Sequence, residues 1–136
     1  MAILDDLGTL LGNAGVGTLG TSLFLGSLPA DTPVSPQDEI TTIIPIPSLP
    51  PVHSHLEAYA TYTQPIFQIL TRSAPFGFAA AMARAELAFR ALDGVQNATI
   101  GGSHFLWILA VRSPYALRQD DYQRYHIVFD VRCAVR

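Results

Sequence analysis

The pattern of apolar and polar residues is clearest between positions 73 and 112. Apolar side chains recur there at three- and four-residue steps, which predicts an amphipathic helix over 76–92. The apolar positions of this helix are Phe78, Met82, Ala85, Phe89 and Leu92. We expect Ser73 to cap the helix, Pro75 to fit its first turn, and Gly94 to end it in the left-handed conformation.

The residues that follow this helix predict a β-hairpin. A short strand over 97–100 and a long apolar strand over 103–111 flank the glycine pair 101–102, which is typical of a tight turn. The long strand is apolar on both faces, although Phe105 and Trp107 are expected in the core. Such a strand needs cover on both faces. One helix layer covers one face, so a subunit contact is the candidate cover for the other.

A short helix, three strands and one loop complete the predicted elements. The helix is expected at 2–11 and the loop at 113–121, and the three strands are expected at 21–25, 64–72 and 122–135. In the last strand, alternate apolar residues share one face, and these are Tyr125, Ile127, Phe129, Val131 and Cys133. The order of the elements predicts a single α+β domain over 1–136, with a largely antiparallel β-sheet and two helices packed on one face.

Residues 29–62 are expected to form a proline-rich arm or loop. Seven of the ten prolines lie between positions 29 and 51. Because proline removes a backbone donor and fixes φ, the segment is expected to be neither a helix nor a central strand. The β-branched run 40–44 is the exception, since it could pair as a sheet edge.

Composition and charge limit the class of protein. A chain of 136 residues with 49% hydrophobic and 14% charged residues is expected to fold as one domain. The net charge of −3 provides no basic field for nucleic acid or anionic membrane. All eight basic residues are arginine, which suits interfaces because its planar guanidinium is pre-organised. No signal peptide or bilayer-spanning run is recognisable, so we expect folding in a cytoplasm.

Candidate catalytic chemistry is sparse. His104, His126 and Asp130 could meet on one sheet face, which makes them the best enzyme-like set in the chain. No spacing enforces such a site, so we expect paired side chains on a polar face and no enzyme. Cys133 is the single cysteine and is expected to be a small core residue.

Two further motifs are weak signals. His53 and His55 stand near Glu57 and could bind a metal, but they lie in the proline-rich arm. The glycines in 15–20 match the dinucleotide fingerprint, yet they follow a predicted helix and precede a strand, the reverse of the context that binds a pyrophosphate. We therefore expect neither a metal nor a cofactor.

Several segments together point to one family. They are Leu4-Asp5-Asp6-Leu7, residues 17–29, residues 64–73, the alanine-rich helix, Leu92-Asp93-Gly94 and Ser113-Pro114 with the tyrosine-rich strand that follows. With these segments, the chain resembles over nearly its whole length the tail terminator (tail completion, or minor capsid) proteins of bacteriophages with long non-contractile tails. It departs from the family pattern at 45–62, which is longer, richer in proline, and lacks the common glycine pair after the second strand.

The resemblance implies a structural virion protein, present in the host cytoplasm during assembly and afterwards at the head–tail interface. Its ring, typically a hexamer, caps the completed tail tube and joins the tail to the head connector. The implied partners are other copies of the chain, the tube protein and the connector protein, while viral DNA passes through the lumen without sequence-specific binding. The expected contact residues are Arg72, Pro45, Ile46, Pro47, Leu49, Pro50, Pro51, Tyr115, Arg118, Asp120 and Asp121.

Three alternative functions stay open from the sequence. The nearest is another virion part, a tail-tube or head–tail connector subunit. The second is a small enzyme that uses His104, His126 and Asp130. The third is a host-directed binding module that uses the arm at 29–62.

Overall fold

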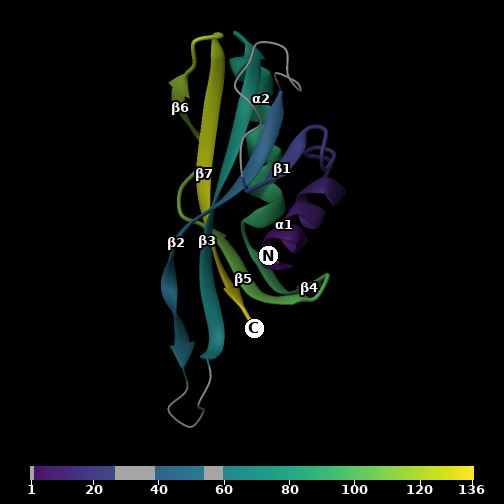
Figure 1. The fold of residues 1–136 in the computed structure, drawn as a ribbon, viewed down its shortest axis with the longest axis vertical. Helices are drawn as coiled ribbons and strands as arrows, with labels where there is room; N and C mark the ends of the chain where they lie inside the picture. The colour runs from purple at the N-terminus through teal and green to yellow at the C-terminus, as the bar shows by residue number, and fades with distance from the viewer. Residues whose placement is uncertain (1, 27–38, 54–59) are drawn as a thin grey trace.

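The structure is a computed structural model that describes residues 2–26, 39–53 and 60–136. These residues form two helices and a seven-stranded sheet, an α+β fold with mostly antiparallel strands, as the sequence predicts (Figure 1). The elements are α1 (Ala2–Asn13), β1 (Leu23–Leu25), β2 (Ile40–His53), β3 (Ala60–Pro75), α2 (Phe78–Leu92), β4 (Val95–Ile100), β5 (Ser103–Ala110), β6 (Tyr115–Gln119) and β7 (Arg124–Val135).

Strand β7 is the centre of the sheet. β3 pairs with it along one whole edge, from Thr63 opposite Val135 to Pro75 opposite Arg124. The other edge is shared, because β6 pairs with the first half of β7 and β5 with the second half. The remaining strands extend the sheet in the order β1-β2-β3-β7-β5-β4. Among the described pairs, β1–β2 is parallel and the others are antiparallel.

Both helices pack on one face of this sheet. The main core cluster joins Leu7 and Leu11 of α1, Ala88 and Leu92 of α2, and Phe129 of β7. The predicted inner face of the last strand is thereby confirmed: Ile127, Phe129, Val131 and Cys133 are buried, and the half-buried Tyr125 packs against the α2 alanines. Burial raises the pKa of the Cys133 thiol to about 12, as suits a core residue.

Helix α2 begins later than the sequence predicts. Ser73 and Pro75 belong to β3, and Gly77 occupies the N-cap position. The Ser73 hydroxyl is used within the sheet, where it accepts a hydrogen bond from the Tyr125 N–H at 2.7 Å. The predicted left-handed glycine after the helix is confirmed by the φ of 87° at Gly94.

The buried face of α2 also differs from the predicted one. The fully buried residues are Ala81, Ala85, Ala88 and Leu92. Met82 and Phe89 flank this stripe and are half-buried, whereas Phe78 is 40% exposed. Small side chains let the helix lie close to the sheet, and the large ones then point along its sides.

The proline-rich stretch after Ile40 is a strand, which corrects the expectation of an arm or loop there. Its first residues are central, because Thr41–Ile43 pairs with β1 on one side and with β3 on the other. The Thr41 N–H donates to Ser22 and the Ile43 carbonyl accepts from Gly26, so these residues turn their backbone groups toward β1.

Backbone groups alternate along a strand, and this explains how β2 accommodates proline. Pro45 shares the orientation of Ile43 but lies beyond the end of β1, where its missing N–H group would face the free edge. Pro47 stands at a register shift between Ile46 and Leu49, where the pairing with β3 is irregular and a proline is tolerated. Figure 1 shows the far halves of β2 and β3 extending as a ribbon beyond both helices.

The stretch 113–121 was predicted as a loop, but it contains the edge strand β6. All five residues of β6 are exposed, so no apolar alternation marks it in the sequence. The hairpin predicted over 97–111 is confirmed by β4 and β5, which meet at the glycine pair 101–102.

Candidate interaction surfaces

The enzyme-like set of two histidines and an aspartate is not brought together. The His104 carbonyl accepts a hydrogen bond from the Arg136 N–H at 3.0 Å, and its Nδ1 lies 2.9 Å from the Thr99 hydroxyl. His126 precedes Arg136 by ten residues along β7, so the two histidines are roughly 30 Å apart at ~3.3 Å per residue. Asp130 is about 13 Å from His126 by the same measure. The structure therefore contradicts a shared site.

His126 belongs instead to a buried polar cluster at the β6–β7 turn. Asp120 Oδ2 accepts hydrogen bonds from Arg124 Nε at 2.9 Å and from His126 Nε2 at 3.1 Å. Asp120 Oδ1 accepts from the backbone N–H groups of Tyr122 and Arg124, at 2.9 and 3.0 Å. A carboxylate that is ionised at pH 7 can only accept hydrogen bonds, so the proton of the neutral His126 ring is on Nε2. One aspartate thus holds the turn and both neighbouring side chains.

The pKa values in this cluster are displaced by burial and hydrogen bonding. Burial alone would raise the pKa of Asp120, but the hydrogen bonds from Arg124, His126 and Tyr122 lower it to about 2. Burial lowers the pKa of His126, and the hydrogen bond to Asp120 offsets this only in part. The cluster is therefore a charged aspartate beside a neutral histidine at pH 7.

Two of the predicted contact residues are interior. Arg72 is 1% exposed and stands opposite His126 in the β3–β7 register, while the Asp120 side chain is 1% exposed. The Arg72 carbonyl accepts a hydrogen bond from Arg84 Nη2 at 2.8 Å, which ties α2 to β3. Neither side chain is presented on the surface of the single chain.

The other predicted contact residues lie at the surface wherever their side chains are described. Tyr115, Arg118 and Asp121 are exposed on β6 and on the turn after it. On β2, the exposed residues are Pro45, Pro47 and Pro50, and Ile46 is half-buried. Leu49 and Pro51 are part of β2, but their side chains lie outside the described set.

The predicted weak motifs do not become sites in the described residues. Residues 15–20 connect α1 to β1, which confirms that the glycine pattern has the wrong context for a dinucleotide. His55 and Glu57 lie outside the described residues, as does the His53 side chain. Within the described ranges, no group of three metal-ligating residues occurs, and neither helix is long and apolar enough to cross a bilayer.

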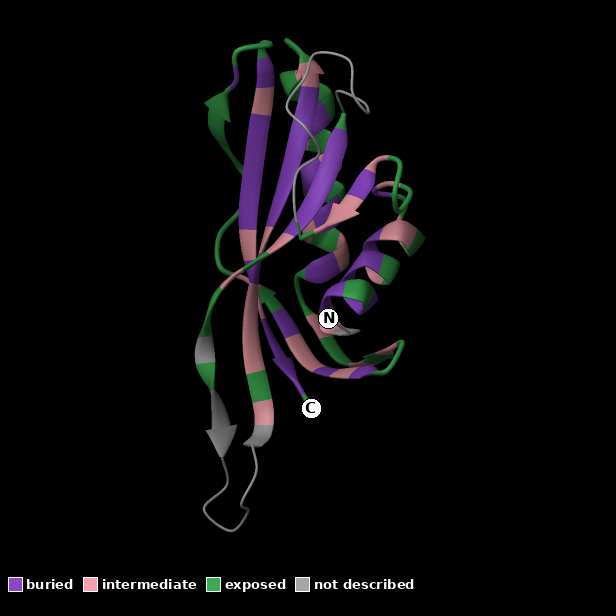
Figure 2. Ribbon diagram, viewed as in Figure 1, coloured by how far each residue is buried: buried purple, intermediate pink, exposed green. Residues whose placement is uncertain are grey.

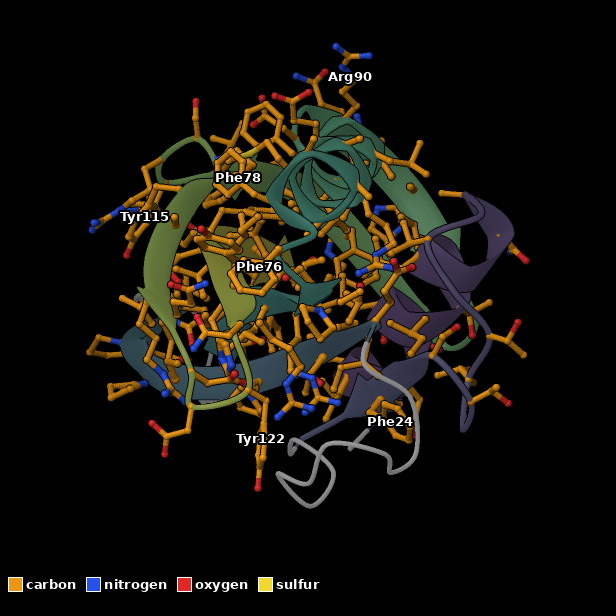
Figure 3. All side chains as sticks on the ribbon, turned by 90° about the horizontal axis from the view of Figure 1, so that it is seen from above. Phe24, Phe76, Phe78, Arg90, Tyr115 and Tyr122 are labelled. Atoms are coloured by element: carbon orange, nitrogen blue, oxygen red, sulfur yellow. The ribbon has the colours of Figure 1, made fainter. Side chains whose placement is uncertain are left out.

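One end of the molecule carries an aromatic surface that sequence reasoning missed. We call Phe76, Phe78 and Tyr122 the aromatic end; they are 74%, 40% and 37% exposed. Figure 3 shows Phe76 in the middle of this end, with Phe78 toward α2 and Tyr122 on the opposite side. The Phe78 ring packs edge-on against Tyr125, at 5.3 Å between centroids. No pattern in the sequence marks Phe76, because its exposure follows from the turn between β3 and α2.

A second apolar surface lies on the sheet face that the helices leave uncovered. We call it the open sheet face, and its residues are Ile66, Trp107, Leu109, Val111 and Arg132. Ile66, Arg132 and Leu109 form one row across β3, β7 and β5. Leu109 is 44% and Val111 55% exposed, although Phe105 on the same chain segment is fully buried. Figure 2 shows buried and intermediate segments following one another along β5, as expected for a strand with one covered face.

Trp107 belongs to this face and is half-buried. The Arg132 guanidinium carbon lies 5.2 Å from the centroid of its ring, so the cation and the indole stack on the sheet surface. The expectation that Trp107 is a core residue is therefore corrected. The two-sided apolar pattern of 103–111 was the sequence signal for this surface.

Comparisons with known proteins identify one family and one shared fold. A family model described as bacteriophage tail terminator protein matches residues 10–136. A solved chain from the virion of a native gene transfer agent particle has a TM-score of 0.56 and 20% sequence identity, covering 95% of this chain and 83% of that chain. At this identity the likeness shows a shared fold. No curated protein matches the sequence.

Proposed function

Because the chain belongs to the bacteriophage tail terminator family, we propose that it forms a closed ring of six copies that caps the completed tail tube and joins it to the head connector. The family makes the chain a structural component of the phage tail, and this supports a role without catalysis. The mechanism we propose is geometric. A ring seated on the growing end of the tube occupies the surface that the next tube subunit would use.

The open sheet face is the observation that supports self-assembly. A monomer rarely leaves large apolar side chains together on one face, and such a surface usually marks a contact with another protein. Leu109 and Val111 are both about half exposed and stand beside the stacked Trp107–Arg132 pair. A head-to-tail contact whose rotation closes gives a ring, and a ring has two different faces for two different partners.

The β2–β3 ribbon is the proposed contact with a neighbour or with the tube end. The ribbon extends beyond both helices, and it carries the exposed Pro45, Pro47 and Pro50 with the half-buried Ile46. Proline stiffens the free segment, so less conformational entropy is lost when it docks. Further proposed contacts are Tyr115, Arg118 and Asp121, which are exposed on β6 and on the turn after it.

Passage of viral DNA is part of the same proposal. The net charge of −3 means that a ring of this chain would carry many negative charges, which repel the phosphate backbone. DNA would then cross the lumen without sequence-specific contacts.

The experiment that tests this function uses purified tail tubes that lack the protein. We expect the protein to bind to one end only of each tube in electron micrographs, and to stop further growth when tube subunits are added. A tail-tube subunit would lengthen the tubes instead, and a connector subunit would bind heads and leave tube growth unchanged. Either of these results would replace the proposed function.

A further inference from the structure

Helix α2 is apolar on the side that faces away from the sheet. We call Ala79, Ala83, Glu86, Leu87 and Arg90 the outer face of α2; all five are exposed, and Leu87 is 42% exposed. Of the fifteen residues of the helix, three are charged: Arg84, Glu86 and Arg90. A helix that is apolar nearly all round is normally buried on both sides. The described residues cover one side only, through Ala81, Ala85 and Ala88.

Charge is distributed unequally between the helices and the last three strands. The helices and the residue after α2 carry the exposed carboxylates Asp5, Glu86 and Asp93 and the exposed Arg90, whereas Asp6 is buried and Arg84 pairs with Glu39. Strands β5, β6 and β7 and their ends carry the arginines Arg112, Arg118, Arg132 and Arg136 and the carboxylates Asp121 and Asp130, besides the buried pair of Arg124 and Asp120. The helices therefore carry a net negative charge and these strands a net positive charge, so the helices of one copy attract the strands of another.

We propose that the open sheet face of one copy packs against the outer face of α2 in the next copy. The inference rests on the proposed ring and names the two surfaces that build it. Apolar Leu109 and Val111 meet Ala83 and Leu87 in this interface. The cation Arg132 on β7 meets the carboxylate Glu86 on α2, and the neighbouring charges, Asp130 on β7 and Arg90 on α2, are also opposite in sign.

The position of the two surfaces determines the type of assembly. α2 lies on one face of the sheet, and the open sheet face is the opposite face of β3, β7 and β5. In Figure 3, Arg90 points away from the body on the α2 side, whereas Tyr122 points away on the opposite side. Two different surfaces on opposite sides give a head-to-tail contact, which continues until it closes on itself. A symmetric dimer would leave one of the two surfaces uncovered.

The test uses two single substitutions at exposed positions. Leu87→Arg places a charge on the outer face of α2, and Leu109→Arg places one on the open sheet face; neither side chain is buried, so folding is expected to stay intact by circular dichroism. Asn13→Arg, at the exposed end of α1, is the matched control. Oligomeric state is measured by sedimentation and native mass spectrometry, with and without tail tubes.

We expect the wild-type chain and Asn13→Arg to form rings, and each of the two variants to stay monomeric. An equimolar mixture of Leu87→Arg and Leu109→Arg is expected to give a heterodimer and nothing larger, because one intact surface remains on each chain. Rings formed by either variant alone, or a mixture that stays monomeric, would overturn the interface and leave the ring proposal standing. A wild-type chain that forms no ring even on tubes would overturn both.

Discussion

The Phe76 N–H donates a hydrogen bond of 2.8 Å to the carbonyl of Gln123, and both residues adopt the left-handed backbone conformation. Their φ angles are 57° and 63°, although neither residue is glycine. The turn before α2 and the turn before β7 thus hold each other at one end of the molecule. The conformation costs about 1–2 kcal/mol per residue, and at Phe76 it exposes an aromatic ring.

Replacing Phe76 by glycine is expected to stabilise the fold. Glycine adopts positive φ without a steric penalty, and the 74% exposed ring contributes little buried area, so Phe76→Gly should raise the free energy of unfolding by ~1 kcal/mol. Urea denaturation measures the change. Phe76→Ala is the control, because it removes the same ring and keeps the left-handed Cβ, and it should change stability by less than about 0.5 kcal/mol. A loss of stability in both variants would show that the ring packs on the fold.

Core packing predicts different costs for two rings that touch. Phe89 and Phe129 pack edge to face at 5.7 Å between centroids, but Phe129 is fully buried and Phe89 only half-buried. Phe129→Ala should therefore cost about 3–5 kcal/mol, and Phe89→Ala about half as much. Equal costs for the two substitutions, from denaturation midpoints at an unchanged slope, would contradict the burial of α2 described above.

The parts of the fold that the sequence predicts are those in which one face packs on a helix. Strand β7 alternates because Ile127, Phe129 and Val131 face the helices, and the hairpin of β4 and β5 is marked by two glycines. Strand β6 has no such signal, since it is exposed throughout. The prolines of β2 look incompatible with a strand until the partner on each side is known.

The candidate surfaces divide in the same way. The apolar run around Trp107 has apolar side chains on both faces of the strand, and this local pattern is visible in the sequence. It therefore predicts a sheet face that the helices leave uncovered. The cluster of Asp120 with Arg124 and His126 depends on how the β6–β7 turn folds back, which no spacing reveals. Phe76 becomes exposed only because Ser73 and Pro75 extend β3 and delay the helix.

Stability is expected to fall in two stages as the pH is lowered. The folded pKa of His126 lies below the usual histidine value of 6.5, so its contribution is full above pH 6.5 and is lost as the pH falls from there through the folded pKa. Asp120 contributes fully above the usual aspartate pKa of 3.8 and loses its contribution as the pH falls through its folded pKa of about 2, which amounts to about 2 kcal/mol.

Urea midpoints at several pH values, compared between variants, check this assignment. His126→Gln should remove the decline that begins near pH 6.5, and Asp120→Asn should flatten the decline below pH 4 while destabilising the protein by about 2 kcal/mol at pH 7. As the pH falls, the unfolded chain binds protons at a higher pH than the folded chain, so both groups lower the free energy of unfolding. If the stability of both variants depends on pH in the same way as that of the wild type, the cluster is not the origin of the two declines.

The free edge of β2 gives the last prediction. Beyond Ile43, the edge carries Pro45 and Pro47, whose missing N–H groups leave no donors there for another strand. The double substitution Pro45→Thr and Pro47→Thr restores a backbone N–H group at both positions of the strand. We expect it to leave the β2–β3 pairing intact by circular dichroism and to increase irregular aggregation, measured by light scattering at equal concentration. The matched variant Ile44→Thr and Ile46→Thr adds the same two side chains to the same strand without adding a backbone N–H group, and it should scatter as the wild type does. If both variants scatter alike, the prolines do not protect the edge, and their place in β2 would have to be explained by docking of the ribbon alone.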